Sequence, residues 1–291
     1  MGGRDLVRGI EDRVFDFFVY SILLFVGLAT IFPMMYVVSV SITPMSEVLK
    51  NGGYVIIPHS ITFDAYKELL GNSAIPRAFS VTLFITVVGT VINMVLTVMM
   101  AYPLSRKTLP LRSFLLLVIA LTMLFSGGLI PLYLVVKATG LLNTVWAMII
   151  PGAIGAFNIL IMKSFFENLP EELFESARID GAKEWRILLQ MVIPLSVPVL
   201  ITVGLFSAVG HWNSFFSAIM YITDPKLHPL QVIVRTILSR AQNPIENFEV
   251  PLPTEAVQMA SVIIACLPVI VVYPFVQKHF TQGMLIGSIK G

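Results

Sequence analysis

Few residues in the apolar segments of this 291-residue chain have side chains suited to catalysis. Of the four histidines, only His211 lies well inside a long apolar segment; His59 and His228 lie in polar stretches, and His279 ends the last apolar run. The single cysteine, Cys266, excludes a disulfide framework and a cysteine-based metal site. Intramembrane catalysis needs paired carboxylates, a metal cluster or a nucleophile with a base. The sequence therefore predicts a non-enzyme with no catalytic residue and no metal site.

The charges concentrate in one segment, Asn168–Ile187. Pro170 at the first helical position, with Glu171 and Glu172 in the first turn, predicts the start of a helix, and Gly181 predicts its end. The expected helix is amphipathic and about three turns long. Its apolar face comprises Leu169, Leu173, Phe174 and Ala177.

The charge of this helix favours a protein neighbour over a lipid surface. Helices that lie on anionic lipid are usually rich in Lys and Arg. Here the acidic residues outnumber the basic ones: Glu171, Glu172, Glu175, Asp180 and Glu184 against Arg178, Lys183 and Arg186. A surface spacer remains the alternative.

The same segment resembles the EAA loop of permease subunits in binding-protein-dependent ABC importers. That family pattern is Glu-Ala-Ala, three residues, Gly, nine residues, Ile, one residue and Leu-Pro. Glu175, Ala177, Gly181 and Pro194 are in register. The departures are small or conservative: Ser176, Met191 and Ile193.

The resemblance implies that this loop is a coupling helix seated in a groove of a separate ATPase subunit. An apolar ridge would bury in that groove, Glu175 would meet a basic residue, and Gly181 would reverse the chain with positive φ. The implied coupling residues are Glu171, Leu173, Phe174, Glu175, Ala177, Asp180 and Gly181. The chain has no Gly-x-x-x-x-Gly-Lys-Ser/Thr motif, so no cofactor is expected in it, and ATP and Mg are expected on the partner ATPase subunit.

The elements that must position this loop are membrane-spanning helices. The chain is 56% hydrophobic and only 12% charged, against roughly 25% charged in a soluble domain. Six runs contain no Asp, Glu, Lys or Arg and are long enough to cross a bilayer. We expect an all-α polytopic membrane protein, and by resemblance a type I ABC importer transmembrane domain over residues 1–291. The expected spans are 15–42, 79–105, 113–136, 143–166, 196–222 and 257–278, with a coupling loop at 167–194 and outer loops at 43–78 and 223–256.

Several features refine these spans. Gly127, Gly128 and Pro131 predict an irregular turn in the third span. The fifth run is longer than one span requires, so the 187–198 side should lie along the membrane surface. The first run is too long for a signal peptide and should stay in the mature protein.

The positive residues predict the orientation. Of the 19 Lys and Arg residues, 12 lie on the side of the termini and the 167–194 loop, and 7 lie on the other side. Cytoplasmic loops carry the excess of Lys and Arg. Both termini and the coupling loop are therefore expected in the cytoplasm, with the chain in the bacterial inner membrane.

Further segments resemble the carbohydrate-uptake branch of these importers: His211-Trp-Asn-Ser-Phe-Phe, Pro229-Leu-Gln, and the ending from Phe280 to Gly291. The resemblance implies one half of a pathway for a sugar or oligosaccharide, including acidic ones such as alginate or aldouronate. The implied partners are a second homologous permease, two nucleotide-binding ATPase subunits, an extracytoplasmic sugar-binding protein and membrane lipid. A net charge of +2 gives no sign of a nucleic-acid partner.

Polar residues within the spans are candidates for the substrate path. A Trp ring can stack on a sugar, and Asn and His can bond its hydroxyls. The candidates are Asn93, Asn158, His211, Trp212 and Asn213, for which helix packing is the alternative. In the tail, Gly283, Gly287 and Lys290 could contact the ATPase, or the tail could be disordered.

An ion-coupled secondary transporter of a small polar solute is the alternative function. Such proteins typically bind the coupling ion through intramembrane carboxylates or broken helices. The six runs contain no Asp or Glu, which weighs against this alternative.

Overall fold

The computed structural model describes residues 10–242 and 254–288, with side chains for 14–240 and 254–275. The regular elements within these ranges are all helical, and none is a strand. The chain forms two compact units, Met1–Gly71 with Ile237–Ile264 and Asn72–Thr236 with Ala265–Gly291. Helix α14 (Glu255–Ser288) contributes residues to both.

Three described helices are long and apolar enough to cross a membrane by themselves: α1 (Ile10–Ser41), α4 (Ala74–Ser105) and α14 as far as Phe275. Three further spans arise if each sharply bent helix pair counts as one. The pairs are Arg112–Leu124 with Leu129–Ala138, Val145–Gly152 with Ala156–Glu167, and Glu184–Leu195 with Val197–Trp212. Up to six spans result, as the sequence predicts.

The break predicted in the third span is present. Helix α5 (Arg112–Leu124) ends before Gly127, α6 (Leu129–Ala138) begins after Gly128, and the two are bent by 113°. Gly128 has a φ of 89°, which a residue without Cβ adopts readily. The fifth span bends by 82° at Ser196, so its 184–195 part departs from the direction of α11 (Val197–Trp212).

The fourth span, expected at 143–166, is irregular at its start. It begins with two 3₁₀ turns, η1 (Val145–Met148) and η2 (Ile150–Gly152), and only then continues as α7 (Ala156–Glu167). Pro151 has no amide hydrogen to donate, and Gly152 and Gly155 are weak helix formers.

The first unit contains α1, α2 (Met45–Lys50) and α3 (Asp64–Gly71). Val40, Val48 and Val55 form its small core. The apolar window of α1 is not buried within the chain at all. That surface requires lipid or another subunit around it.

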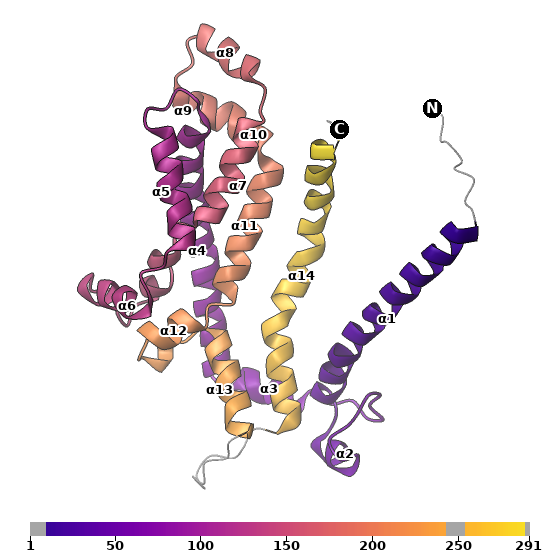
Figure 1. The fold of residues 1–291 in the computed structure, drawn as a ribbon. Helices are drawn as coiled ribbons and strands as arrows, with labels where there is room; N and C mark the ends of the chain where they lie inside the picture. Colours follow the sequence, from indigo (N-terminus) through magenta and orange to yellow (C-terminus); the bar gives the residue numbers. More distant parts are fainter. Residues whose placement is uncertain (1–9, 243–253, 289–291) are drawn as a thin grey trace. The chain divides into compact units, whose positions relative to one another are not determined.

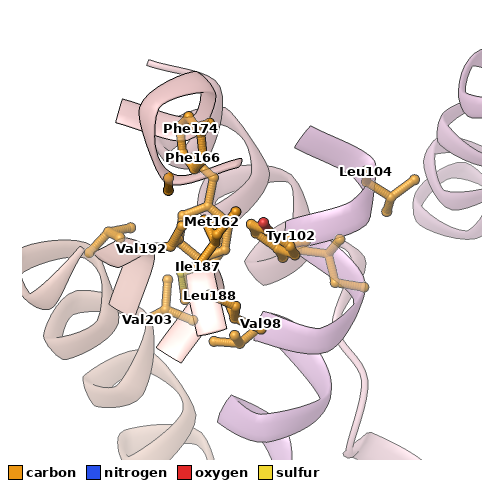
Figure 2. Packing of buried hydrophobic residues seen from close by; sticks show 14 residues of the cluster. Val98, Tyr102, Leu104, Met162, Phe166, Phe174, Ile187, Leu188, Val192 and Val203 are labelled. Atoms are coloured by element: carbon orange, nitrogen blue, oxygen red, sulfur yellow. The ribbon is translucent and has the colours of Figure 1, made fainter. Parts of the chain in front are cut away.

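The second unit is built on α4, α7 and α11, which pack side by side (Figure 1). Within this unit α8 (Glu171–Ile179) and α9 (Glu184–Ile187) lie at one end of the three helices, and α6 and α12 (Phe216–Tyr221) lie at the other. One core joins α4, α7, α8, α9, the π-helical turn η3 (Leu188–Val192) and α11 (Figure 2). Its buried residues are Val98, Ala101, Tyr102, Leu104, Ile159, Met162, Phe166, Phe174, Ala177, Ile187, Leu188, Val192, Val199 and Val203.

Helices α4 and α11 approach closely at Gly89. A Cβ atom placed there would lie 2.7 Å from two atoms of the His211 ring, nearer than real contacts allow. Glycine at this position therefore sets the approach of the two helices and the place of the imidazole.

We predict that Gly89→Ala displaces the His211 ring and destabilises the second unit by about 1–3 kcal/mol, the usual cost of overpacking. Thermal unfolding of the purified protein in detergent measures this. Gly210→Ala on α11, where a Cβ would meet nothing within 4 Å, is the matched control and should not lower the melting temperature. Adding His211→Ala to Gly89→Ala should recover stability; a double variant as unstable as the single one would contradict this account.

Candidate functional site

Helix α8 is the amphipathic helix that the sequence predicts. Glu171 and Glu172 occupy its first turn, where they complement the positive end of the helix dipole. Its C-terminus closes in a Schellman arrangement: the amide of Ala182 donates to the carbonyl of Ala177 (2.9 Å) and that of Gly181 to Arg178 (3.0 Å). Gly181 has a φ of 75°, which confirms the predicted chain reversal at that residue.

The apolar face of α8 packs into its own chain. Phe174 is 2% exposed and lies with Phe166 and Met162 in the core (Figure 2). Ala177 is also buried, and Leu173 is half-buried. This corrects the expectation of a docking ridge, because burial in the second unit leaves Phe174 and Ala177 no surface to offer a partner.

Arg106 holds Phe174 from the other side. This residue follows the last residue of α4, and its guanidinium carbon lies 3.6 Å from the centre of the Phe174 ring and 4.8 Å from that of Tyr102. A guanidinium stacked on an aromatic face is stabilised by the ring quadrupole, more so when it is desolvated. The end of α4 and the coupling-type helix are thus joined by a stacked contact.

A second link runs through Glu184. The Tyr102 hydroxyl donates a 2.5 Å hydrogen bond to one carboxylate oxygen, and Arg178 Nε donates to the other at 3.1 Å. These bonds, first that from Tyr102, lower the pKa of Glu184. The Arg178–Glu184 pair is largely exposed and contributes little by itself. The firmer tie is the part-buried bond from Tyr102.

The outward face of α8 carries a stripe of residues spaced by one helical turn: Glu171, Glu175 and Ile179. All three are exposed, and Ile179 is 86% exposed. Asp180 and Gly181 are exposed beside the stripe. The sequence reasoning missed Ile179, although an apolar residue four positions after Glu175 on the polar face was a readable signal.

At the other end of the second unit lies a cavity of about 530 Å³ with a polar floor. The floor joins three helices: Ser207 Oγ donates to Asn93 Oδ1 at 2.7 Å, and Asn158 Nδ2 donates to Ser207 at 3.3 Å and to Asn93 at 3.4 Å. Asn93 also donates to the carbonyl of Ala153 in the irregular segment before α7 (3.0 Å). The structure thus brings two path candidates together with Ser207, which the sequence reasoning did not select.

The three neighbouring candidates, residues 211 to 213, have different surroundings. His211 and Asn213 line the cavity, and Asn213 is exposed. Trp212 is buried: its ring packs edge-on against Phe79 at 5.8 Å, and its indole nitrogen donates to the carbonyl of Ala265 at 3.0 Å. Trp212 is therefore a packing residue, which was the alternative considered for it.

The three candidates in the C-terminal tail can be placed only by their backbone or not at all. Gly283 and Gly287 lie within the helical backbone of α14, whose side chains are described only to Phe275, and Lys290 lies outside the described residues. Groups of three or more potential metal ligands do not occur among the described residues.

Comparison with known families accounts for both helix α8 and the cavity. Residues 91–286 match the model of the binding-protein-dependent transport system inner membrane component. The chain belongs to this family. The match includes helix α8 and all of the residues that line the cavity. The chain is thus the membrane component of an ABC importer, in which ATP is hydrolysed by a separate subunit.

Relatives that align with this chain over nearly their whole length support this family assignment. The polygalacturonan/rhamnogalacturonan transport system permease protein YtcP of Bacillus subtilis (strain 168) is 41% identical over 287 residues, 97% of this chain and 100% of YtcP. Protein LplC of the same organism is 46% identical over 283 residues, 96% of each chain. A subunit of a bacterial ABC transporter involved in the import of the acidic polysaccharide alginate has a similar crystal structure, with a TM-score of 0.85 and 32% identity over 94% of this chain and 98% of that one.

We predict that Phe174→Ala releases α8 from the second unit, because truncating a buried Phe costs about 3–5 kcal/mol. Amide hydrogen exchange over residues 171–181 should accelerate strongly. Ile179→Ala, on the same helix but exposed, is the control and should leave exchange unchanged. Unaltered protection in Phe174→Ala would show that the stacked contact does not hold the helix.

Proposed function

We propose that this chain is one of two permease subunits of an ATP-driven oligosaccharide importer, and that its substrates are acidic, uronate-containing chains. The printed names of YtcP and of the alginate transporter support this class of substrate. A second homologous permease, two ATPase subunits that hold ATP and Mg, and an extracytoplasmic sugar-binding protein complete the assembly. The ion-coupled alternative finds no support in these relatives.

The observation that carries the proposal is the geometry of α8. The helix is anchored by Phe174 and presents the Glu171, Glu175 and Ile179 stripe outward. Two carboxylates beside an apolar side chain suit a groove with a basic rim and an apolar floor. We assign these three residues, with Asp180 and Gly181 beside them, as the contact with the ATPase subunit.

Helix α4 connects this contact to the cavity. Arg106 and Tyr102 hold α8 at one end of α4, and Asn93 in the cavity floor lies about 20 Å further along, at 1.5 Å per residue. A continuous helix transmits displacement of one end to the other. Closure of the ATPase subunits would therefore move the floor of the cavity through α4.

The cavity lining suits a sugar path. Its described polar side chains can form hydrogen bonds, and none is a carboxylate: Asn93, Asn158, Ser207, His211, Asn213, Ser214, Ser217 and Tyr221. Hydroxyls can exchange bonds with amides and imidazole, and an acidic sugar meets no like charge. We propose that this cavity lines this chain's share of the path.

We also propose that α8 and both termini face the cytoplasm, in accord with the distribution of Lys and Arg. Positions 283, 287 and 290 would then lie on the side of the ATPase subunits. Tail contacts with those subunits remain part of the proposal.

We predict that Glu175→Lys lowers both uptake and substrate-stimulated ATP hydrolysis at least ten-fold, because a reversed charge opposes the basic rim of the groove; a ten-fold loss corresponds to about 1.4 kcal/mol. Uptake is measured in vesicles holding the complete importer, with labelled oligogalacturonate, oligoalginate and a neutral oligosaccharide. The acidic sugars should be the preferred substrates.

The control for this test is Glu68→Lys, an exposed charge reversal on α3 in the first unit, which should retain coupled activity. Normal coupling in Glu175→Lys would count against α8 as the ATPase contact. Preference for the neutral sugar would overturn the substrate class and leave the coupling assignment intact.

We predict opposite accessibility for two cysteines placed in a Cys266→Ala background. In inside-out vesicles stripped of the ATPase subunits, Ile179→Cys should react with a membrane-impermeant maleimide, and it should stay unlabelled in right-side-out vesicles. Glu68→Cys should react only in right-side-out vesicles. Labelling of Ile179→Cys from outside intact cells would reverse the proposed orientation.

A further inference from the structure

Arg106 lacks a counter-ion in contact with it. Its Nε and Nη2 are enclosed and have no hydrogen-bond partner, and the described ion pairs do not include it. Its contacts are the two rings of Tyr102 and Phe174, and the carboxylates of Glu184 and Glu171 act on it only through space. A partly enclosed cation without a bonded anion is costly, so the site favours an anion from outside the chain.

A pocket of about 460 Å³ opens beside this guanidinium. Arg106 and Arg178 line one end, while Met99, Pro103 and Leu188 line the apolar remainder. Met99 lies about 10 Å from Arg106 along α4, two turns inside the span. The Glu184 carboxylate also reaches the pocket, but it is bonded to Tyr102 and Arg178.

The surroundings of the pocket indicate a boundary between lipid and water. Arg106 directly follows the apolar helix α4, the exposed Leu111 comes shortly after it in the sequence, and the exposed Trp185 lines the pocket. Trp is enriched where spans meet the headgroup layer. A cationic end at headgroup level and an apolar wall extending into the span suit a molecule with both characters.

We infer that this pocket binds the headgroup of an anionic phospholipid, with the phosphate at Arg106 and Arg178 and an acyl chain along Met99 and Leu188. A free phosphate would use the cationic end but gain nothing from the apolar wall. A carboxylate of a soluble partner would have to enter beside residues at membrane depth. Basic pockets between helices at the membrane surface are suited to such lipids. The inference rests on membrane insertion and not on the coupling role of α8.

The test measures lipid retention by the assembled importer. The complex is delipidated in detergent, supplied with equal amounts of phosphatidylglycerol and phosphatidylcholine with identical acyl chains, and examined by native mass spectrometry without ATP. Arg106→Gln should retain several-fold less phosphatidylglycerol than the native complex. Lys107→Gln removes the neighbouring exposed charge, which does not line the pocket, and should retain the native amount.

Met99→Trp fills the apolar wall without changing charge and should also reduce phosphatidylglycerol retention. Thermal unfolding confirms that each variant remains assembled. Equal losses in Arg106→Gln and Lys107→Gln would reduce the effect to general surface charge and overturn the inference. Displacement of the lipid by millimolar inorganic phosphate would show that the site takes a free anion, and this would overturn it as well. Reduced transport with normal lipid retention would count against lipid binding at this pocket but leave the proposed function standing.

Discussion

The enclosure of Phe174 beneath Arg106 is the contact on which the rest of the second unit depends. Without it, α8 would be held to the unit only by Ala177 and by the exposed Arg178–Glu184 pair, besides the chain at its two ends. With it, the helix becomes a rigid extension of α4, because a buried aromatic ring and a stacked guanidinium leave little freedom. Rigidity is what a coupling element needs, since a flexible one would absorb displacement without transmitting it.

The membrane sets a second constraint, visible where the spans are interrupted. Backbone N–H and C=O groups left unpaired where a membrane span is interrupted need partners from the protein. Asn93 meets this need at the irregular start of the fourth span by donating to the carbonyl of Ala153. The same amide group thus satisfies a broken helix and forms the polar floor of the cavity. The interrupted fourth span and the polar residues of the cavity therefore depend on each other.

Much of this organisation could be predicted from the sequence, because it depends on local pattern. Long charge-free runs indicate spans, Gly127-Gly128 indicates a break, and Pro170 to Gly181 marks a short helix with its ends. Whether the apolar face of that helix packs into its own chain or faces outward could not be predicted. An apolar face may serve a partner or the chain itself, and only the distant partners Tyr102, Arg106 and Phe166 decide between them. Pairings such as Tyr102 with Glu184, 82 positions apart, leave no local trace.

The division of roles on α8 follows from this packing. Because Phe174 and Ala177 are engaged in the core, the proposed contact with an ATPase subunit falls to the exposed stripe, in which two carboxylates precede Ile179. Charged rims select partners and speed encounter, while an apolar side chain at the centre of a contact supplies most of its affinity. In the proposed assembly, one short helix would thus have a buried face that transmits displacement and an outer face that recognises its partner. The two faces can vary independently, since substitutions on the stripe leave the anchoring core untouched.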